Sequence, residues 1–188
     1  MRLLLQVSLG WVFCAAVLAE VEVPFDYRGP EVRGRVFGES LGMMNRERSE
    51  YATNLAIFAA NNVWARKASP GSLGLARRAL GLALHLSPRN KSAVALDRKL
   101  ESGELPGQVP SEYSPDTLAE LLVRRAEVLY QQKGEENRLL ARALIDLAVS
   151  IDPENEDAIY AFELQKIEHG EVAWETFTEA GSVEVDRE

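Results

Sequence analysis

Two stretches of this 188-residue chain nearly repeat one another. Residues 82–90 read LALHLSPRN and residues 147–155 read LAVSIDPEN, which is an offset of 65 residues. The same offset pairs further identical residues on either side: Ala76-Arg77 with Ala141-Arg142, Leu82-Ala83 with Leu147-Ala148, Pro88 with Pro153, Asn90 with Asn155 and Ala93 with Ala158. A long internal repeat is typical of a fold built by duplicating one supersecondary unit. We therefore expect two similar units in one chain.

Within each copy the apolar residues have helical spacing, three and four residues apart. They are Leu75, Ala76, Ala79, Leu80, Ala83 and Leu86 in the first copy, and Leu140, Ala141, Leu144, Leu147, Ala148 and Ile151 in the second. Each run ends at a proline, Pro88 or Pro153, which lacks an amide donor and restricts the residue before it. Asn90 and Asn155 follow two residues later and are predicted to cap the next helix.

A longer amphipathic segment precedes each run, at about residues 46–67 and 115–132, and a turn separates the two. A third helix is predicted after each proline, at roughly residues 91–101 and 156–168. The predicted fold class is therefore all-α. We expect a short stack of antiparallel helical hairpins, an α-α superhelix of two duplicated three-helix units. The only candidates for extended structure are short pieces between Val21 and Phe37.

The second helix of each hairpin places two small residues around a bulky one and ends in proline: Ala76, Leu80, Ala83 and Pro88, then Ala141, Ile145, Ala148 and Pro153. This pattern resembles the second helix of a tetratricopeptide repeat, and residues 152–155 (DPEN) are similar to its closing turn. The period of 65 differs from the family's usual length of about 34, and Trp64, Leu129 and Tyr130 do not fit its first-helix register. The chain thus resembles a divergent member or a related helical-hairpin repeat. The resemblance implies a right-handed stack with a protein-interaction role.

The N-terminal segment is typical of a secretory signal peptide. An apolar run from Leu3 to Leu18 follows Met1-Arg2, and the stretch Val17-Leu18-Ala19 suits a cleavage site. The run is short for a membrane span, and a buried N-terminal helix would require a polar face that it lacks. We predict cleavage after Ala19, no stable membrane span afterwards, and a periplasmic or secreted protein.

The remaining boundaries follow from the breaks in periodicity. The predicted organisation is signal peptide (1–19), extended N-terminal arm (20–44), first helical unit (45–102), linker (103–113), second helical unit (114–170), capping helix (171–180) and disordered tail (181–188). The glycine- and proline-rich arm is expected either to pack on the helices or to wait for a partner. The capping helix is expected to cover the open end of the stack.

Charge is distributed unevenly along the chain, whose formal net charge is −8. Residues 45–102 contain ten lysines or arginines against four acids, whereas residues 152–188 contain twelve acids against two basic residues. The acidic balance argues against nucleic-acid binding. The asymmetry has two interpretations: ordinary solvated helix surfaces, or a basic and an acidic end that orient a partner or the next copy of the chain.

No residue pattern indicates catalysis or a cofactor. The only cysteine, Cys14, lies in the predicted signal peptide, and the two histidines, His85 and His169, have no common motif and are expected to cap helices or to be exposed. The acidic group around Asp152 lacks the glycine that bends a calcium loop, and no nucleophile elbow, phosphate loop or zinc helix is present. We expect no enzymatic activity, no cofactor and no metal.

The candidate partner-binding residues are Asn61, Asn62, Arg124 and Arg125. Two adjacent amides on a helix could hydrogen-bond a peptide backbone, or they could face solvent and satisfy a neighbouring helix end. Two adjacent arginines could bind a carboxylate, or they could be solvated helix charges.

The function predicted from these features is an exported, non-catalytic adaptor of the cell envelope that binds a protein or peptide. The first alternative is a structural subunit that self-associates head to tail through its oppositely charged ends. A third, weaker alternative is a small hydrolase or ligand-binding protein.

Overall fold

A computed structural model describes residues 25–180 of the chain. The predicted signal peptide, the first residues of the arm and the predicted tail lie outside this range. The described part is all-helical and has seven helices and no strand, which confirms the predicted all-α stack of hairpins. The helices are α1 (Asn45–Ala65), α2 (Pro70–Leu86), α3 (Lys91–Glu101), α4 (Pro115–Gln132), α5 (Glu135–Ile151), α6 (Glu156–His169) and α7 (Glu175–Thr178).

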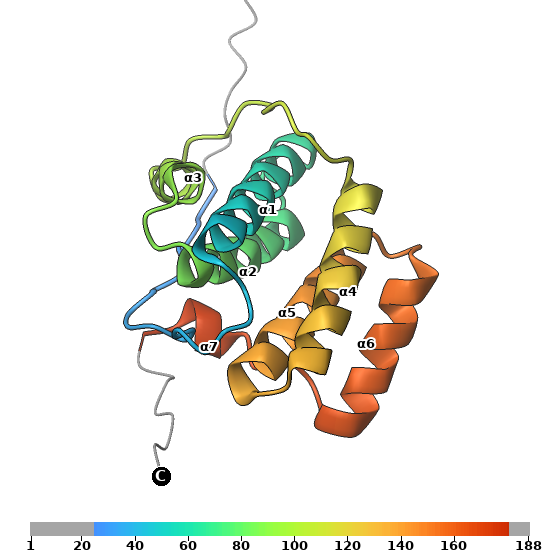
Figure 1. Ribbon diagram of the computed structural model, residues 1–188. Helices are drawn as coiled ribbons and strands as arrows, with labels where there is room; N and C mark the ends of the chain where they lie inside the picture. The colour runs from blue at the N-terminus through green and yellow to red at the C-terminus, as the bar shows by residue number, and fades with distance from the viewer. Residues whose placement is uncertain (1–24, 181–188) are drawn as a thin grey trace, which may run out of the picture.

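The two hairpins, α1–α2 and α4–α5, stand side by side (Figure 1). Helix α2 meets α5 in the middle of the molecule, whereas α3 packs mainly on α1 and α6 packs mainly on α5. The two third helices therefore lie at opposite ends of the stack, as Figure 1 shows. None of the helices between residues 25 and 180 is both long enough and apolar enough to cross a bilayer.

The two copies have the same local structure at the predicted turns. The first residue after α2 is Ser87, with φ −145° and ψ 87°. Its equivalent after α5 is Asp152, with φ −131° and ψ 90°. Asn90 Oδ1 accepts a hydrogen bond from the amide of Ala93 at 3.1 Å, and Asn155 Oδ1 accepts one from Ala158 at 2.9 Å. Both predicted asparagine caps are confirmed. They satisfy amide donors that the first turn of a helix would leave unpaired.

Alanines line the contact between the helices of each hairpin. The fully buried alanines include Ala52, Ala59, Ala76, Ala79 and Ala83 in the first hairpin and Ala119, Ala126, Ala141, Ala143 and Ala148 in the second. Small side chains let two helix backbones approach closely, and leucines such as Leu55, Leu80, Leu122 and Leu144 fill the remaining space.

The described part of the arm, residues 25–44, packs on the helices and contributes Tyr27, Val36, Phe37, Leu41 and Met43 to the core. Two of its glycines bind the start of α5. The amide of Gly38 donates to Glu136 Oε2 at 3.0 Å, and the amide of Gly42 donates to Asn137 Oδ1 at 2.8 Å. Of the two expectations for the arm, packing is thus what the structure shows, and the arm joins the first unit to the second.

The C-terminal segment does not cover the outer face of the last helix, so this expectation is wrong. Helix α7 has only four residues, and it packs on α2 near the middle of the molecule. Phe177 is fully buried, with ring centroids 6.0 Å from Phe37 and 5.9 Å from His85. Trp174 Nε1 donates to Asp146 of α5 at 3.1 Å. The two aromatic residues therefore contact the arm, α2 and α5.

Gly81 of α2 makes close packing of α7 possible, and replacing it tests this contact. A Cβ on Gly81 would lie 2.6 Å from the Phe177 carbonyl oxygen, whereas one on Gly74, two turns earlier, would meet nothing within 4 Å. Gly81→Ala should lower the free energy of unfolding by about 1–3 kcal/mol through overpacking, despite its better helix propensity. Gly74→Ala should raise it by up to about 1 kcal/mol. Urea denaturation of both variants measures the difference, and a stabilising Gly81→Ala would contradict the contact.

The two asparagine caps allow a matched comparison. The Asn90 side chain also donates to the Ser49 carbonyl at 3.1 Å and to Thr53 Oγ1 at 2.8 Å, which ties α3 to α1. Among the described residues, the Asn155 side chain makes its cap bond alone. Asn155→Ala should cost about 1 kcal/mol of unfolding free energy and Asn90→Ala about 2 to 3 kcal/mol. Thermal and urea melts of the two variants check the order, and equal losses would show that the α1 contacts add nothing.

Candidate functional site

A groove lies between α1 and α4, the first helices of the two hairpins. It encloses about 870 Å³ and is lined by Tyr51, Asn54 and acidic residues of α1, by Glu112 and Tyr113 of the preceding segment, and by Leu118 and Leu121 of α4. Figure 1 shows α1 and α4 as neighbours that bound the front of the molecule. The lining thus combines aromatic rings, an amide and carboxylates, which suits a polar segment with an occasional apolar side chain.

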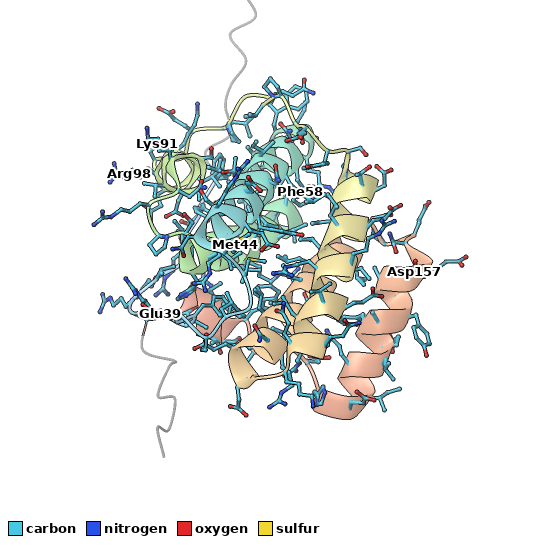
Figure 2. The ribbon with its side chains drawn as sticks, viewed as in Figure 1. Glu39, Met44, Phe58, Lys91, Arg98 and Asp157 are labelled. Atoms are coloured by element: carbon cyan, nitrogen blue, oxygen red, sulfur yellow. The ribbon has the colours of Figure 1, made fainter. Side chains whose placement is uncertain are left out.

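One stripe of α1 runs from this groove toward the linker, and its first three residues line the groove. Its members recur at four and three residues, the spacing that places side chains on one helix face: Glu47, Tyr51, Asn54, Phe58 and Asn61. Figure 2 shows Phe58 on the side of α1 that faces α4. The stripe ends beside the segment that joins the two units.

At that end, the side chain of Asn61 binds the backbone of the segment between α3 and α4. Its Nδ2 donates to the carbonyl of Val109 at 2.9 Å, and its Oδ1 accepts from the amide of Val109 at 2.7 Å. The side-chain amide therefore pairs with both the N–H and the C=O of Val109, as the backbone of a neighbouring β-strand does with its partner. The bound residue belongs to the chain's own linker.

Asn54 occupies the same stripe two turns earlier and lines the open groove. Its half-buried side chain makes no hydrogen bond to any described residue of the chain. An amide with two donors and one acceptor is thus available where a second stretch of backbone could lie. The spacing of four and three residues from residue 47 to residue 61 places Asn54 on the same helix face as Asn61. The hydrogen bonds of Asn61 show how an amide at this position can be used.

The base of the groove is electrically neutralised. Arg125 of α4 contacts Glu47 twice, with Nε 2.8 Å from Oε1 and Nη2 3.1 Å from Oε2, and Nη2 also donates to the Gly42 carbonyl at 2.5 Å. Burial, aided by Glu47, raises the pKa of Tyr51 to about 12, so its hydroxyl stays protonated as a donor. At the rim, Glu50 pairs with Arg46 at 2.9 Å. Glu112 makes no ion pair with a described residue, so it gives the rim a negative charge.

The structure separates the four residues predicted from sequence. Asn61 and Arg125 are engaged inside the chain, with the linker and with the arm and α1 respectively. Arg124 is exposed and has one 3.5 Å contact with Glu120, and Asn62 is half-buried without a side-chain hydrogen bond to the described residues. Binding of a partner by any of the four stays a prediction. Tyr51, Asn54, Glu112 and Tyr113 were not predicted from sequence.

Two ionisable side chains outside the groove, His85 and Asp97, have pKa values shifted by their surroundings. His85 is buried against Phe177, so the expectation of an exposed or capping histidine is wrong for this residue. Burial lowers the pKa of its imidazole to about 4, and a hydrogen bond with the Phe177 backbone opposes this shift. Asp97 of α3 accepts a hydrogen bond from the Tyr27 hydroxyl at 3.3 Å. Burial and the charge of Glu101 raise its pKa to about 6, and the bond from Tyr27 opposes this shift.

Residues 25–180 contain no group of three histidine, cysteine, aspartate or glutamate side chains placed to hold a metal ion. At the acidic turn after α5, Asp152 Oδ1 accepts from the amide of Glu154 at 3.2 Å, which is a turn contact.

Comparison of the chain with protein-family models, with curated proteins and with solved structures gave no significant match. The assignment of a function therefore depends on the geometry of the groove and of the exposed surfaces.

The pKa of His85 is lowered and that of Asp97 is raised, so the two residues should affect the stability of the fold in acid in opposite directions. The folded chain binds fewer protons at His85 than the unfolded chain, so stability is lost as the pH falls from 6.5 to about 4. At Asp97 the folded chain binds more protons, so stability is present below pH 3.8 and is lost as the pH rises through about 6.

Substitutions separate the two effects. On moving from pH 7 to pH 4, His85→Gln should gain about 2 kcal/mol of unfolding free energy relative to the parent. Asp97→Asn should lose about 1 kcal/mol relative to the parent over the same interval, a value reduced for its partial exposure. Urea denaturation at several pH values measures both, and shifts of the same sign would contradict the assignment.

Proposed function

We propose that this chain is an exported, non-catalytic protein-interaction module, a divergent tetratricopeptide-like adaptor, whose groove between α1 and α4 binds an extended peptide segment. The observation that carries this proposal is the two-bond grip of Asn61 on Val109. It supports the proposal, because an amide of the α1 stripe hydrogen-bonds both the N–H and the C=O of one residue. Asn54 offers the same chemistry in the open part of the groove.

The lining also defines the chemistry of the peptide. Tyr51, Tyr113 and Leu121 offer an apolar and aromatic surface for one large side chain. Glu112 favours a lysine or arginine next to it, since this carboxylate has no cation of its own among the described residues. We therefore expect a segment with an apolar residue beside a basic one, bound in extended form.

In the proposed mechanism, groups already placed on α1 and α4 bind the peptide. Because Arg125 already neutralises Glu47 beneath the groove, a bound peptide does not have to compensate a buried charge there. The backbone of the peptide would be held by amide hydrogen bonds, while the aromatic rings would select its side chain. Export to the cell envelope is inferred from the N-terminal sequence.

A peptide-display selection on the purified full chain tests this proposal. Selected peptides should be enriched in an apolar residue next to lysine or arginine, and Asn54→Ala should weaken their binding about tenfold, the loss expected for two hydrogen bonds. Gln131→Ala is the control, because Gln131 is an exposed amide of α4 with no side-chain partner among the described residues. Titration by isothermal calorimetry measures each affinity. Peptides that bind Asn54→Ala as tightly as the parent, or a selection without enrichment, would overturn the proposal.

A further inference from the structure

Helix α6 exposes an apolar stripe at one end of the molecule. Tyr160 is 72% exposed, Leu164 42% and Ile167 81%, and their spacing of four and three residues places them on one face. Four of the eight large apolar residues exposed among the described residues lie on this helix, the fourth being Ile159. A concentration of this kind on one helix marks an interaction surface, whereas scattered apolar residues do not.

Acidic residues flank this stripe on both sides. Helical spacing places Glu156 and Glu163 along one side and Asp157 and Glu168 along the other. All four are exposed, and Lys166 of the same helix is paired with Glu171 at 2.8 Å. An occupant of this face must therefore bring an apolar surface with positive charge around it.

The opposite end of the molecule has that surface. A groove of about 300 Å³ lies between α1, α3 and the segment that follows α3. Most of its walls are apolar: Ile57 and Ala60 of α1, Ala95 and Leu96 of α3, and Pro106 and Val109 of the segment. Lys99 lies at its edge, with one 3.6 Å contact to the exposed Glu104.

The charge beside this groove is basic. Lys91 and Arg98 lie on the outward side of α3, and Figure 2 shows them at the opposite end of the molecule from Asp157. The acids of α3 are turned to its other side. Asp97 binds the Tyr27 hydroxyl, and the Glu101 carboxylate lies beside Gly29 of the arm. The groove edge therefore presents lysine and arginine without these carboxylates.

We propose that α6 of one copy docks in the groove between α1 and α3 of the next copy. Tyr160, Leu164 and Ile167 would enter the apolar groove while the acids of α6 meet the lysines and arginine of α3. Because the two surfaces differ and lie at opposite ends of the molecule (Figure 1), the contact is head to tail and leaves a free surface at each end for further copies. This inference does not rest on the peptide groove between α1 and α4.

Two variants of the full chain, each with one surface blocked, test the proposal. Ile167→Glu blocks the α6 stripe, and Ala95→Glu blocks the groove; both residues are exposed and helical, so each variant should keep its fold by circular dichroism. The parent should increase in mass with concentration by sedimentation velocity, from about 10 µM to about 500 µM, and less so at high salt. Each variant alone should remain a monomer.

The mixture is the decisive sample. Combined in equal amounts, the two variants retain one intact α6 and one intact groove, so they should form a 1:1 dimer that grows no further. Val128→Glu, which charges an exposed apolar residue of α4, is the matched control and should assemble as the parent does. Assembly by Ala95→Glu alone would show that α6 pairs with α6, and a monomeric parent or mixture would equally overturn the proposal. Asn54→Ala should assemble normally, which separates this outcome from failure of the peptide groove.

Discussion

The close approach of helices across alanine determines the architecture. Each hairpin joins two helices through small, fully buried side chains, so the backbones lie near one another and leucines at the edges fill the space. This contact is selective, because a larger residue in the seam would separate the helices and open cavities beside the leucines. The stack, the groove between α1 and α4 and the exposed ends all follow from two hairpins held at this spacing.

Local patterns predicted the hairpins well. Helical spacing and proline breaks located the helices, and the cap geometry of Asn90 and Asn155 was correct because a cap bond joins residues three apart. Local patterns do not predict where the C-terminal segment packs. Its position depends on Gly81, almost 100 residues earlier in the chain, because the absence of a side chain there leaves room for the Phe177 carbonyl. His85 was misjudged for the same reason. Its burial comes from Phe177 and not from its own helix.

The groove shows the same division between local and distant information. Sequence singled out Asn61 as a residue able to hold a backbone, and it does so, but its partner Val109 is a residue of this chain 48 positions away. Arg125 likewise pairs with Glu47 and Gly42, which no spacing rule connects to it. Asn54 carries the same chemistry on the same helix face, and only the three-dimensional groove distinguishes it from other amides. The repeat thus accounts for the positions of the helices. The groove depends on long-range contacts that differ between the two copies.

The crossed attachment of the two ends has a consequence for the order in which the chain can fold. Gly38 and Gly42 of the arm donate to Glu136 and Asn137, and Arg77 donates to Thr178, so the partners are 98, 95 and 101 residues apart. The arm leaves the ribosome long before α5, and α2 long before α7. Each hairpin can form locally, but its last apolar surfaces stay uncovered until residue 178 has emerged. The core is therefore completed only after α7 has been synthesised, and a chain truncated before residue 178 leaves both units unfinished.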